Sequence, residues 1–191
     1  MSKHQLLRDI AIEIESDNLL KELRESASQL VMGAGSFDTD IVFIGEAPGR
    51  KEDESGLPFM GLSGRLLDEG LELAGLRRRD VYITNIVKYR PPGNRDPSNS
   101  EKDYFWPYLV KEIEVIKPKV IATLGRHSLS FIIPSAKINQ DHGKRLITEI
   151  DGVEHVVVPL YHPAATIYNR SLKPSFNDDF IKLREIVEQI N

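Results

Sequence analysis

Four short apolar runs, separated by segments with helical spacing, limit what this chain can fold into. The runs span residues 40–45, 81–86, 119–125 and 155–160. Runs that are apolar at nearly every position are typical of strands buried on both faces, as in parallel sheets. The helical segments lie at about 63–75, 98–117, 126–133 and 175–190. Strands that alternate with helices predict right-handed crossovers and a four-stranded parallel sheet covered on both faces, which is an α/β fold.

The 191 residues fit one domain of usual size, so we expect a single domain over 1–191. Residues 1–32 are expected to form an N-terminal helical segment, with a break near 16–18. Residues 145–150 and 154–158 flank Asp151-Gly152 and are a candidate hairpin at the sheet edge.

The composition excludes several classes of protein. The chain has no cysteine, which excludes disulfides, thiolate nucleophiles, zinc fingers and cysteine-ligated iron–sulfur clusters. Its formal charge of −4 is too small to indicate a partner, so any DNA site must be a local patch. No apolar run approaches the roughly 20 residues that span a bilayer, and the first residues lack the apolar core of a signal peptide. We therefore expect a cytoplasmic protein with no membrane partner.

Ligands of open parallel sheets bind beyond the carboxyl ends of the strands, and polar residues follow these runs. Glu46 comes directly after the first run, between Gly45 and the turn Ala47-Pro48-Gly49. Glycine lets backbone amides approach a ligand closely, while proline stiffens the turn. The motif is neither a phosphate loop nor a dinucleotide fingerprint. The competing interpretation is an ordinary strand-to-helix turn.

Three further side chains are candidates for a ligand site at the carboxyl ends of the strands. Phe59, in a loop framed by glycine and proline, offers either a flat ring for stacking or a core contact. Asn85 lies near the end of the second run and either pairs with a nucleobase edge or caps the strand. His162 follows the fourth run and precedes Pro163. It is either a catalytic group, acting as an acid, a base or an electrostatic stabiliser, or a structural histidine. His127 is interpreted as a structural residue at a helix start.

Basic residues gather in two loops. Lys88, Arg90 and Arg95 alternate with Pro91, Pro92 and Gly93, which predicts a stiff loop suited to DNA phosphates, with a solvated charged loop as the alternative. Residues 142–145 contain Lys144 and Arg145 and form a second candidate phosphate-contacting loop.

Taken in order, these motifs resemble the uracil-DNA glycosylase superfamily, and its family 4 most closely. The resemblance runs from about residue 30 to the C-terminus and rests on residues 44–49, 52–53, 56–61, 82–97 and 159–165. It implies a three-layer α/β/α sandwich around a central four-stranded parallel sheet. It also implies hydrolysis of the N-glycosidic bond of deoxyuridine in DNA, which leaves an abasic site.

The resemblance also implies roles for single residues. Phe59 would stack on the flipped uracil, Asn85 would hydrogen-bond the uracil edge, and His162 would stabilise negative charge on uracil O2. Glu46 matches the acid that positions or activates the attacking water, with Glu52 and Asp53 as the alternatives. Gly45, Ala47 and Pro48 complete the expected substrate-binding set.

The chain departs from family 4 at two places. That family typically holds a four-iron four-sulfur cluster on four cysteines, whereas Tyr89 and Phe105 stand at two of these positions and the other two fall near Asn18 and Lys21. We expect no metal or other cofactor, with the loop held by aromatic packing instead. The leucine-rich wedge of the family is replaced by residues 164–169, where Ile167 or Tyr168 is expected to enter the duplex beside Arg170.

The expected partner is uracil-containing DNA, bound by a monomer. One alternative is a catalytically weak, base-recognising DNA-binding protein of the same fold. The other is a small-molecule-binding α/β module with a flavodoxin-like sheet. A DNA groove requires the basic residues, which also include Lys173, to share one face.

Overall fold

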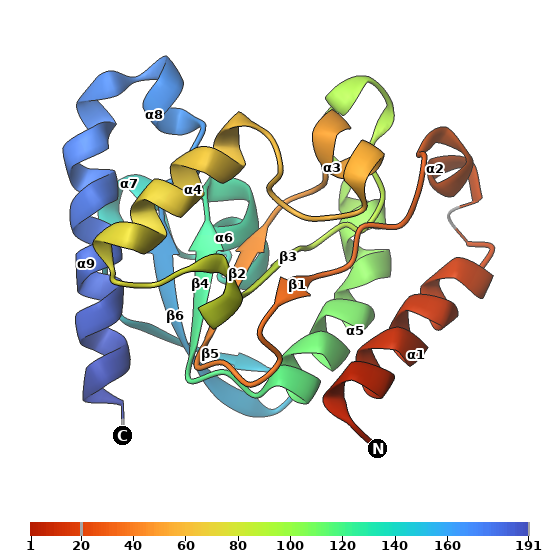
Figure 1. Cartoon of the computed structure of the whole chain (residues 1–191), viewed down its shortest axis with the longest axis horizontal. Coiled ribbons are helices and arrows are strands. Elements are labelled where there is room, and N and C mark those ends of the chain that lie inside the picture. Colours follow the sequence, from red (N-terminus) through yellow and green to blue (C-terminus); the bar gives the residue numbers. More distant parts are fainter. Residues whose placement is uncertain (20, 191) are drawn as a thin grey trace.

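The computed structural model describes residues 1–19 and 21–190, and its centre is a sheet with strand order β1-β3-β2-β4-β6-β5 (Figure 1). The strands are β1 (Ala34–Gly35), β2 (Ile41–Gly45), β3 (Tyr82–Asn85), β4 (Val120–Leu124), β5 (Leu146–Ile150) and β6 (Val153–Leu160). β3, β2, β4 and β6 pair in parallel, as the four apolar runs predict.

Antiparallel strands close both edges of the parallel core. β5 pairs with β6, which confirms the predicted hairpin. β1 pairs with β3 at the other edge and was not expected. Two residues are too few to show an alternating pattern, so sequence spacing carries no signal for β1.

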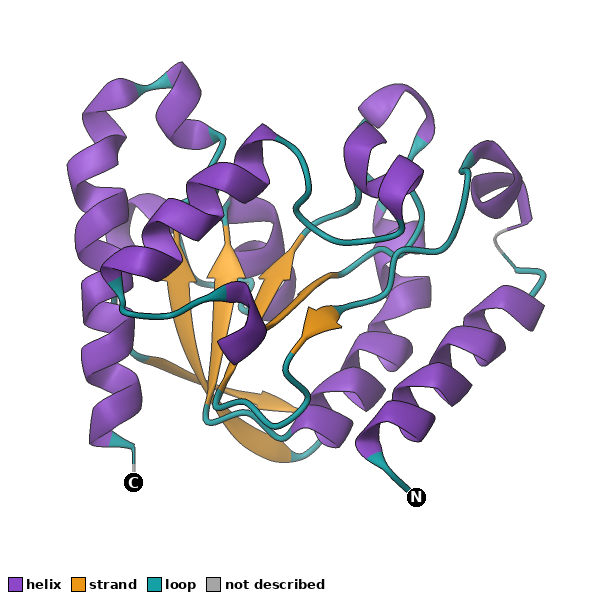
Figure 2. Ribbon diagram, in the orientation of Figure 1, coloured by secondary structure: helices purple, strands orange, loops and turns teal. Residues whose placement is uncertain are grey.

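Helices cover both faces of the sheet (Figure 2). They are α1 (Lys3–Ser16), α2 (Lys21–Ser26), α3 (Arg50–Ser55), α4 (Leu62–Leu73), α5 (Asn99–Ile116), α6 (Arg126–Ile132), α7 (Ile138–Asp141), α8 (Ala165–Tyr168) and α9 (Lys173–Gln189). α4 packs with α9, and α1 packs with α5. The three-layer arrangement expected from the resemblance is therefore confirmed.

The continuous apolar runs follow from this double burial. In β2, Val42 and Ile44 face a core shared with α1 and α5, whereas Ile41 and Phe43 face a core shared with α4 and α9. Successive side chains of a strand point to opposite faces, so a strand between two helical layers is apolar at every position. The same geometry brings the carboxyl ends of all four parallel strands to one edge.

Among the described residues, no helix is both long enough and apolar enough to pass through a bilayer.

Candidate active site

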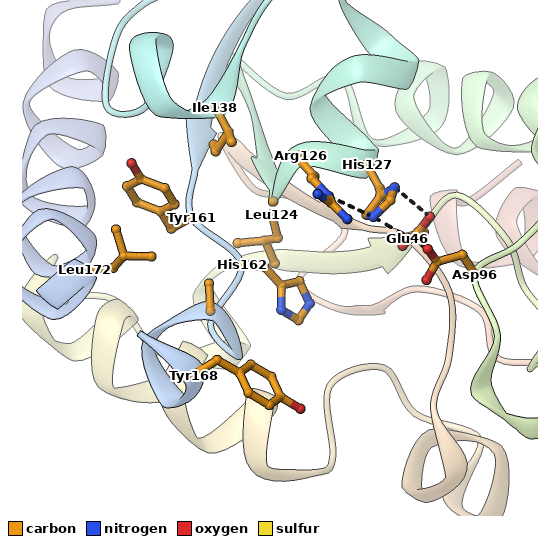
Figure 3. Close-up of a pocket in the computed structure, with 12 residues that line it drawn as sticks. Glu46, Asp96, Leu124, Arg126, His127, Ile138, Tyr161, His162, Tyr168 and Leu172 are labelled. Atoms are coloured by element: carbon orange, nitrogen blue, oxygen red, sulfur yellow. Dashed lines mark hydrogen bonds and ion pairs between the residues drawn. The ribbon is translucent and has the colours of Figure 1, made fainter. Parts of the chain in front are cut away.

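The turns that follow the parallel strands enclose two adjoining cavities. One, of about 470 Å³, is lined by Ala47, Phe59, Asn85 and His162 among others. The other, of about 510 Å³, is lined by Glu46 and His127 and shares His162 with the first. Figure 3 shows the His162 ring projecting into this second cavity between Glu46 and Tyr168. The four turns that were expected to converge therefore do meet at one edge of the sheet.

Position 45 has no room for a side chain, because Asn85 and Phe59 both lie against Gly45. It pairs with Asn85 across β2 and β3. A Cβ atom at Gly45 would collide with the Asn85 Oδ1 atom and lie 2.7–2.8 Å from the Phe59 ring. Because glycine has no side chain, the carboxamide and the ring can both approach this turn.

Arg78 fixes the loop that carries Phe59, a residue with a positive φ of 54°. The guanidinium donates hydrogen bonds to the carbonyl oxygens of Pro58 (3.1 Å) and Phe59, and its Nε donates to Asp68 (2.5 Å). A left-handed conformation is costly for a bulky residue and needs such support. The sequence analysis missed Arg78, since it lies about 20 residues beyond the loop within a run of three arginines.

Three carboxylates were candidates for the water-activating group, and two of them are already engaged. Glu52 accepts hydrogen bonds from the backbone N–H groups of Gly49, Met60 and Gly61. Asp53 is buried and accepts from the Ser28 backbone and hydroxyl. In the described part of the chain, Glu46 Oε1 is buried and accepts no hydrogen bond. Of the three, Glu46 has the carboxylate that is free for chemistry.

Glu46 lies in a mixed electrostatic environment. Burial raises the pKa of its carboxyl group, and nearby Asp96 raises it further. His127, Lys102 and Arg126 act in the opposite direction. The His127 Nδ1 atom lies 3.4 Å from Glu46 Oε1.

His127 therefore lines the same cavity as Glu46, and it also lies in the first turn of α6, as the sequence predicts. Its ring also accepts a hydrogen bond at Nε2 from Arg126 Nε (3.1 Å), and Nε2 lies 3.8 Å from Asp96. It lies two residues after Gly125, just past the carboxyl end of β4, and this position is the sequence signal that marks it as a candidate. The same rule was applied to Glu46, Asn85 and His162.

Glu46, Asp96 and His127 also bring three metal-ligand atoms within 4.8 Å of one another. The closest approaches, however, join Glu46 to Nδ1 and Asp96 to Nε2. One imidazole cannot give both nitrogens to a single ion. The ring therefore lies between the two carboxylates, with a different nitrogen nearest to each.

His162 is held in one protonation state. Its Nδ1 atom accepts a hydrogen bond from the Ala164 backbone (3.2 Å), so the ring proton is on Nε2. Burial, helped by the nearby His127, lowers the pKa of His162 to about 4. Gly125 allows this burial, because its φ is 94° and a Cβ there would lie 2.8 Å from the His162 Cβ. At neutral pH, His162 is a neutral N–H donor.

Lys88 does not contact DNA, and that prediction is wrong. The side chain is fully buried, with Nζ 2.5 Å from the Glu112 carboxylate of α5. Nζ also donates hydrogen bonds to the Thr84 hydroxyl and to the backbone carbonyl of Asn85, both at 2.7 Å. A buried lysine needs a carboxylate partner, and the spacing of charges in a loop does not reveal one across the fold. Lys88 supports the turn that holds Asn85.

The other residues predicted to contact DNA differ in whether their side chains are already hydrogen-bonded within the protein. Arg95 donates two hydrogen bonds to Glu101 (2.8 and 2.6 Å), and Arg90 donates to Asn94 (2.7 Å). Exposed residues are Lys144, Arg145, Ile167, Tyr168 and Arg170. Tyr168 is 90% exposed and lines both cavities, whereas Lys144 and Arg145 line neither.

A family model for the uracil DNA glycosylase superfamily matches residues 32–185. The chain belongs to the uracil DNA glycosylase superfamily. It is 43% identical to a type-4 uracil-DNA glycosylase from Archaeoglobus fulgidus, over 94% of this chain and 92% of that protein. It is 44% identical to one from Saccharolobus solfataricus, over 81% and 74%, and 37% identical to one from Thermotoga maritima, over 95% and 97%.

The iron–sulfur cluster implied by the resemblance to family 4 does not fit this member of the superfamily. The chain has no cysteine. Tyr89 and Phe105 pack edge to face with ring centroids 6.0 Å apart, and Tyr104 packs on Phe105 at 5.1 Å. The Tyr108 hydroxyl donates to Asp17 (3.3 Å), which joins α5 to the end of α1. The expected aromatic packing is therefore present, and we call Tyr89, Tyr104, Phe105 and Tyr108 the aromatic cluster.

Proposed function

We propose that this protein hydrolyses the N-glycosidic bond of deoxyuridine in DNA, releasing uracil and leaving an abasic site. The observation that carries the proposal is the cavity in which Phe59, Asn85 and His162 meet, with Glu46 in the adjoining cavity that shares His162. The type-4 uracil-DNA glycosylases to which the chain is similar support the same reaction.

Substrate binding starts with extrusion of the base, because the glycosidic bond is inaccessible inside a stacked duplex. The extruded uracil stacks on the Phe59 ring, and the Asn85 carboxamide offers both a donor and an acceptor to its edge. Asn85 is 3% exposed, so a base lacking the matching groups leaves that carboxamide unpaired. The pocket thereby favours uracil over bases with other edges.

The reaction breaks the bond between C1′ and N1, and the electron pair leaves with uracil as an anion. The neutral Nε2–H group of His162 donates to O2, where negative charge builds up, which is the main source of rate enhancement for such a step. The Glu46 carboxylate favours the positive charge on the sugar and orients the water that attacks C1′. It accepts the proton as the new C1′–O bond forms.

Residues outside the pocket provide the remaining DNA contacts in this proposal. Tyr168, with Ile167 beside it in α8, is the side chain best placed to fill the space left by the extruded base, because it is exposed and borders both cavities. Arg170, Lys144, Arg145 and the partly paired Arg90 and Arg95 provide positive charge for phosphates. The proposal includes a monomer as the active form.

A strand-cleavage assay tests the proposal. Purified protein is incubated with an oligonucleotide that contains one uracil, and alkali then cuts the strand at any abasic site. We expect cleavage at uracil and none in the matched thymine oligonucleotide. Asn85→Ala and His162→Ala should each lose about 10²-fold or more in rate, the usual effect of removing a positioned donor. Retarded migration of uracil-containing DNA without uracil release would instead support a base-recognising binding protein.

A further inference from the structure

The imidazole of His127 lies between two carboxylates at the start of α6 (Figure 3). Nδ1 faces Glu46 at 3.4 Å, and Nε2 faces Asp96 at 3.8 Å. The His127 side chain is 35% exposed and that of Glu46 is 19% exposed, so the contact lies at the wall of the cavity and not in open solvent.

The hydrogen bond from Arg126 determines which nitrogen of His127 carries the proton. Arg126 Nε is always a donor, so the Nε2 atom that it contacts at 3.1 Å must accept. In a neutral imidazole the proton then belongs to Nδ1, the nitrogen that faces Glu46. The ring therefore presents an N–H group to the free carboxylate oxygen of Glu46.

Glu46 has few other groups to orient it. Its Oε1 atom accepts no hydrogen bond within residues 1–19 and 21–190, and it is buried. The charged groups that act on Glu46 are Asp96, Lys102 of α5, and Arg126 and His127 of α6, while His162 lies across the cavity. His127 has the largest charge effect among these groups and opposes the effect of burial.

We propose that His127 is a positioning residue for Glu46. Its Nδ1–H group faces the Glu46 carboxylate at 3.4 Å and orients it toward the attacking water, while the hydrogen bond from Arg126 fixes the other side of the ring. The inference deepens the proposed function and rests on it, because both concern the same carboxylate. In this role His127 acts through Glu46 and not directly on uracil.

The contact is tested first in the free protein, without any reaction. A ¹⁵N spectrum of the imidazoles at pH 8 should show His127 protonated on Nδ1, and not on Nε2 as most neutral histidines are. In protein with ¹³C-labelled glutamate, the Glu46 carboxyl should titrate at higher pH in His127→Phe than in the unsubstituted protein. Nε2 protonation together with an unchanged Glu46 titration would overturn the inference.

The rate of uracil release under single-turnover conditions provides the second test. We expect His127→Phe to be about tenfold slower at pH 7.5, with DNA affinity within about twofold, because a misplaced catalytic group slows chemistry and not binding. The acid limb of its pH–rate profile should move to higher pH, since Glu46 is active as the carboxylate.

His127→Asn keeps an N–H group near the position of Nδ1 and should recover part of the rate. His4→Ala, an exposed histidine of α1, is the matched control and should behave as the unsubstituted protein.

The two tests separate this inference from the proposed function. If the unsubstituted protein releases no uracil, the proposed function fails, while the spectra of the free protein still decide whether His127 holds Glu46. If the protein is active and His127→Phe matches it in rate and pH profile, the positioning role is wrong and the glycosylase proposal stands.

Discussion

A single residue, His162, shows how burial determines the chemistry of the site. Its neighbours leave Nδ1 as an acceptor and keep the ring neutral, with a pKa of about 4. A charged imidazolium would already bind the ground-state carbonyl of uracil strongly, whereas a neutral donor in a preorganised site acts mainly as charge develops on O2. In the proposed reaction, burial of His162 therefore favours the transition state, and it has a cost in stability under acidic conditions.

That cost gives a prediction. Between about pH 6.5 and 4, the unfolded chain binds a proton at residue 162 that the folded chain does not, so stability increases with pH over this range. The free energy of unfolding should lose up to about 3 kcal/mol from this group as the pH falls through that window. Urea unfolding at pH 7 and pH 4.5 should show a smaller acid loss in His162→Gln than in the unsubstituted protein. His4→Gln should leave the acid loss unchanged, and an equal loss in all three proteins would contradict the assigned pKa.

Residues of the site differ in how well the sequence predicts them. The sequence predicts that Glu46, Phe59, Asn85 and His162 lie close together. Each of them follows a strand or lies in a glycine-framed loop, and the carboxyl ends of parallel strands converge at one edge of the sheet. The roles of Arg78 and Lys88 could not be predicted, because they depend on partners in other elements. The spacing of charges along the chain does not report which way a side chain turns.

At the scale of elements, the buried Lys88–Glu112 pair joins the turn after β3 to α5. Glu112 also accepts hydrogen bonds from Tyr82 (3.1 Å) and Thr84 (2.9 Å), two residues of β3. The polar network therefore fixes β3 against the helix that covers it. Since Lys88 also donates to the Asn85 carbonyl, the network supports the position of the Asn85 side chain in the cavity.

Removing one partner of this pair should be severe, whereas replacing both should not. Glu112→Leu leaves an uncompensated buried ammonium group and should cost about 3–5 kcal/mol in the free energy of unfolding. The double variant Glu112→Leu with Lys88→Met replaces both charges by apolar groups and should recover much of that loss. Urea unfolding of the four proteins forms a double-mutant cycle. Additive losses, with no recovery in the double variant, would contradict the coupling.

The sequence predicts a helix or a strand where burial of that element produces a regular pattern of apolar residues. The parallel strands and α4, α5, α6 and α9 have patterns long enough to identify, and the structure contains them close to the expected bounds. β1 consists of two residues, and α8 consists of four residues in a turn after Pro163. Such short elements are set by tertiary contacts and not by local periodicity.

For the whole molecule, a net charge of −4 means that DNA binding depends on a local basic surface. The logarithm of DNA affinity should fall linearly with the logarithm of salt concentration, with a slope set by the number of phosphates contacted. Arg170→Ala should reduce that slope by about one, as expected for one lost phosphate contact. Fluorescence anisotropy across a salt series measures it. Lys21→Ala, an exposed lysine of α2, is the control, and an equal slope in both variants would remove Arg170 from the interface.

The aromatic cluster joins the N-terminal segment, α5 and the loop at 88–95. Phe105 is fully buried between Tyr89 and Tyr104, and Tyr108 reaches Asp17. Phe105→Ala should therefore cost about 3–5 kcal/mol in the free energy of unfolding, as for other large buried rings, whereas Phe105→Leu should cost less. Chelators should change neither the thermal unfolding nor uracil release of the unsubstituted protein. Stoichiometric iron in that protein, or a Phe105→Ala variant of undiminished stability, would show that something other than aromatic packing holds the three segments together.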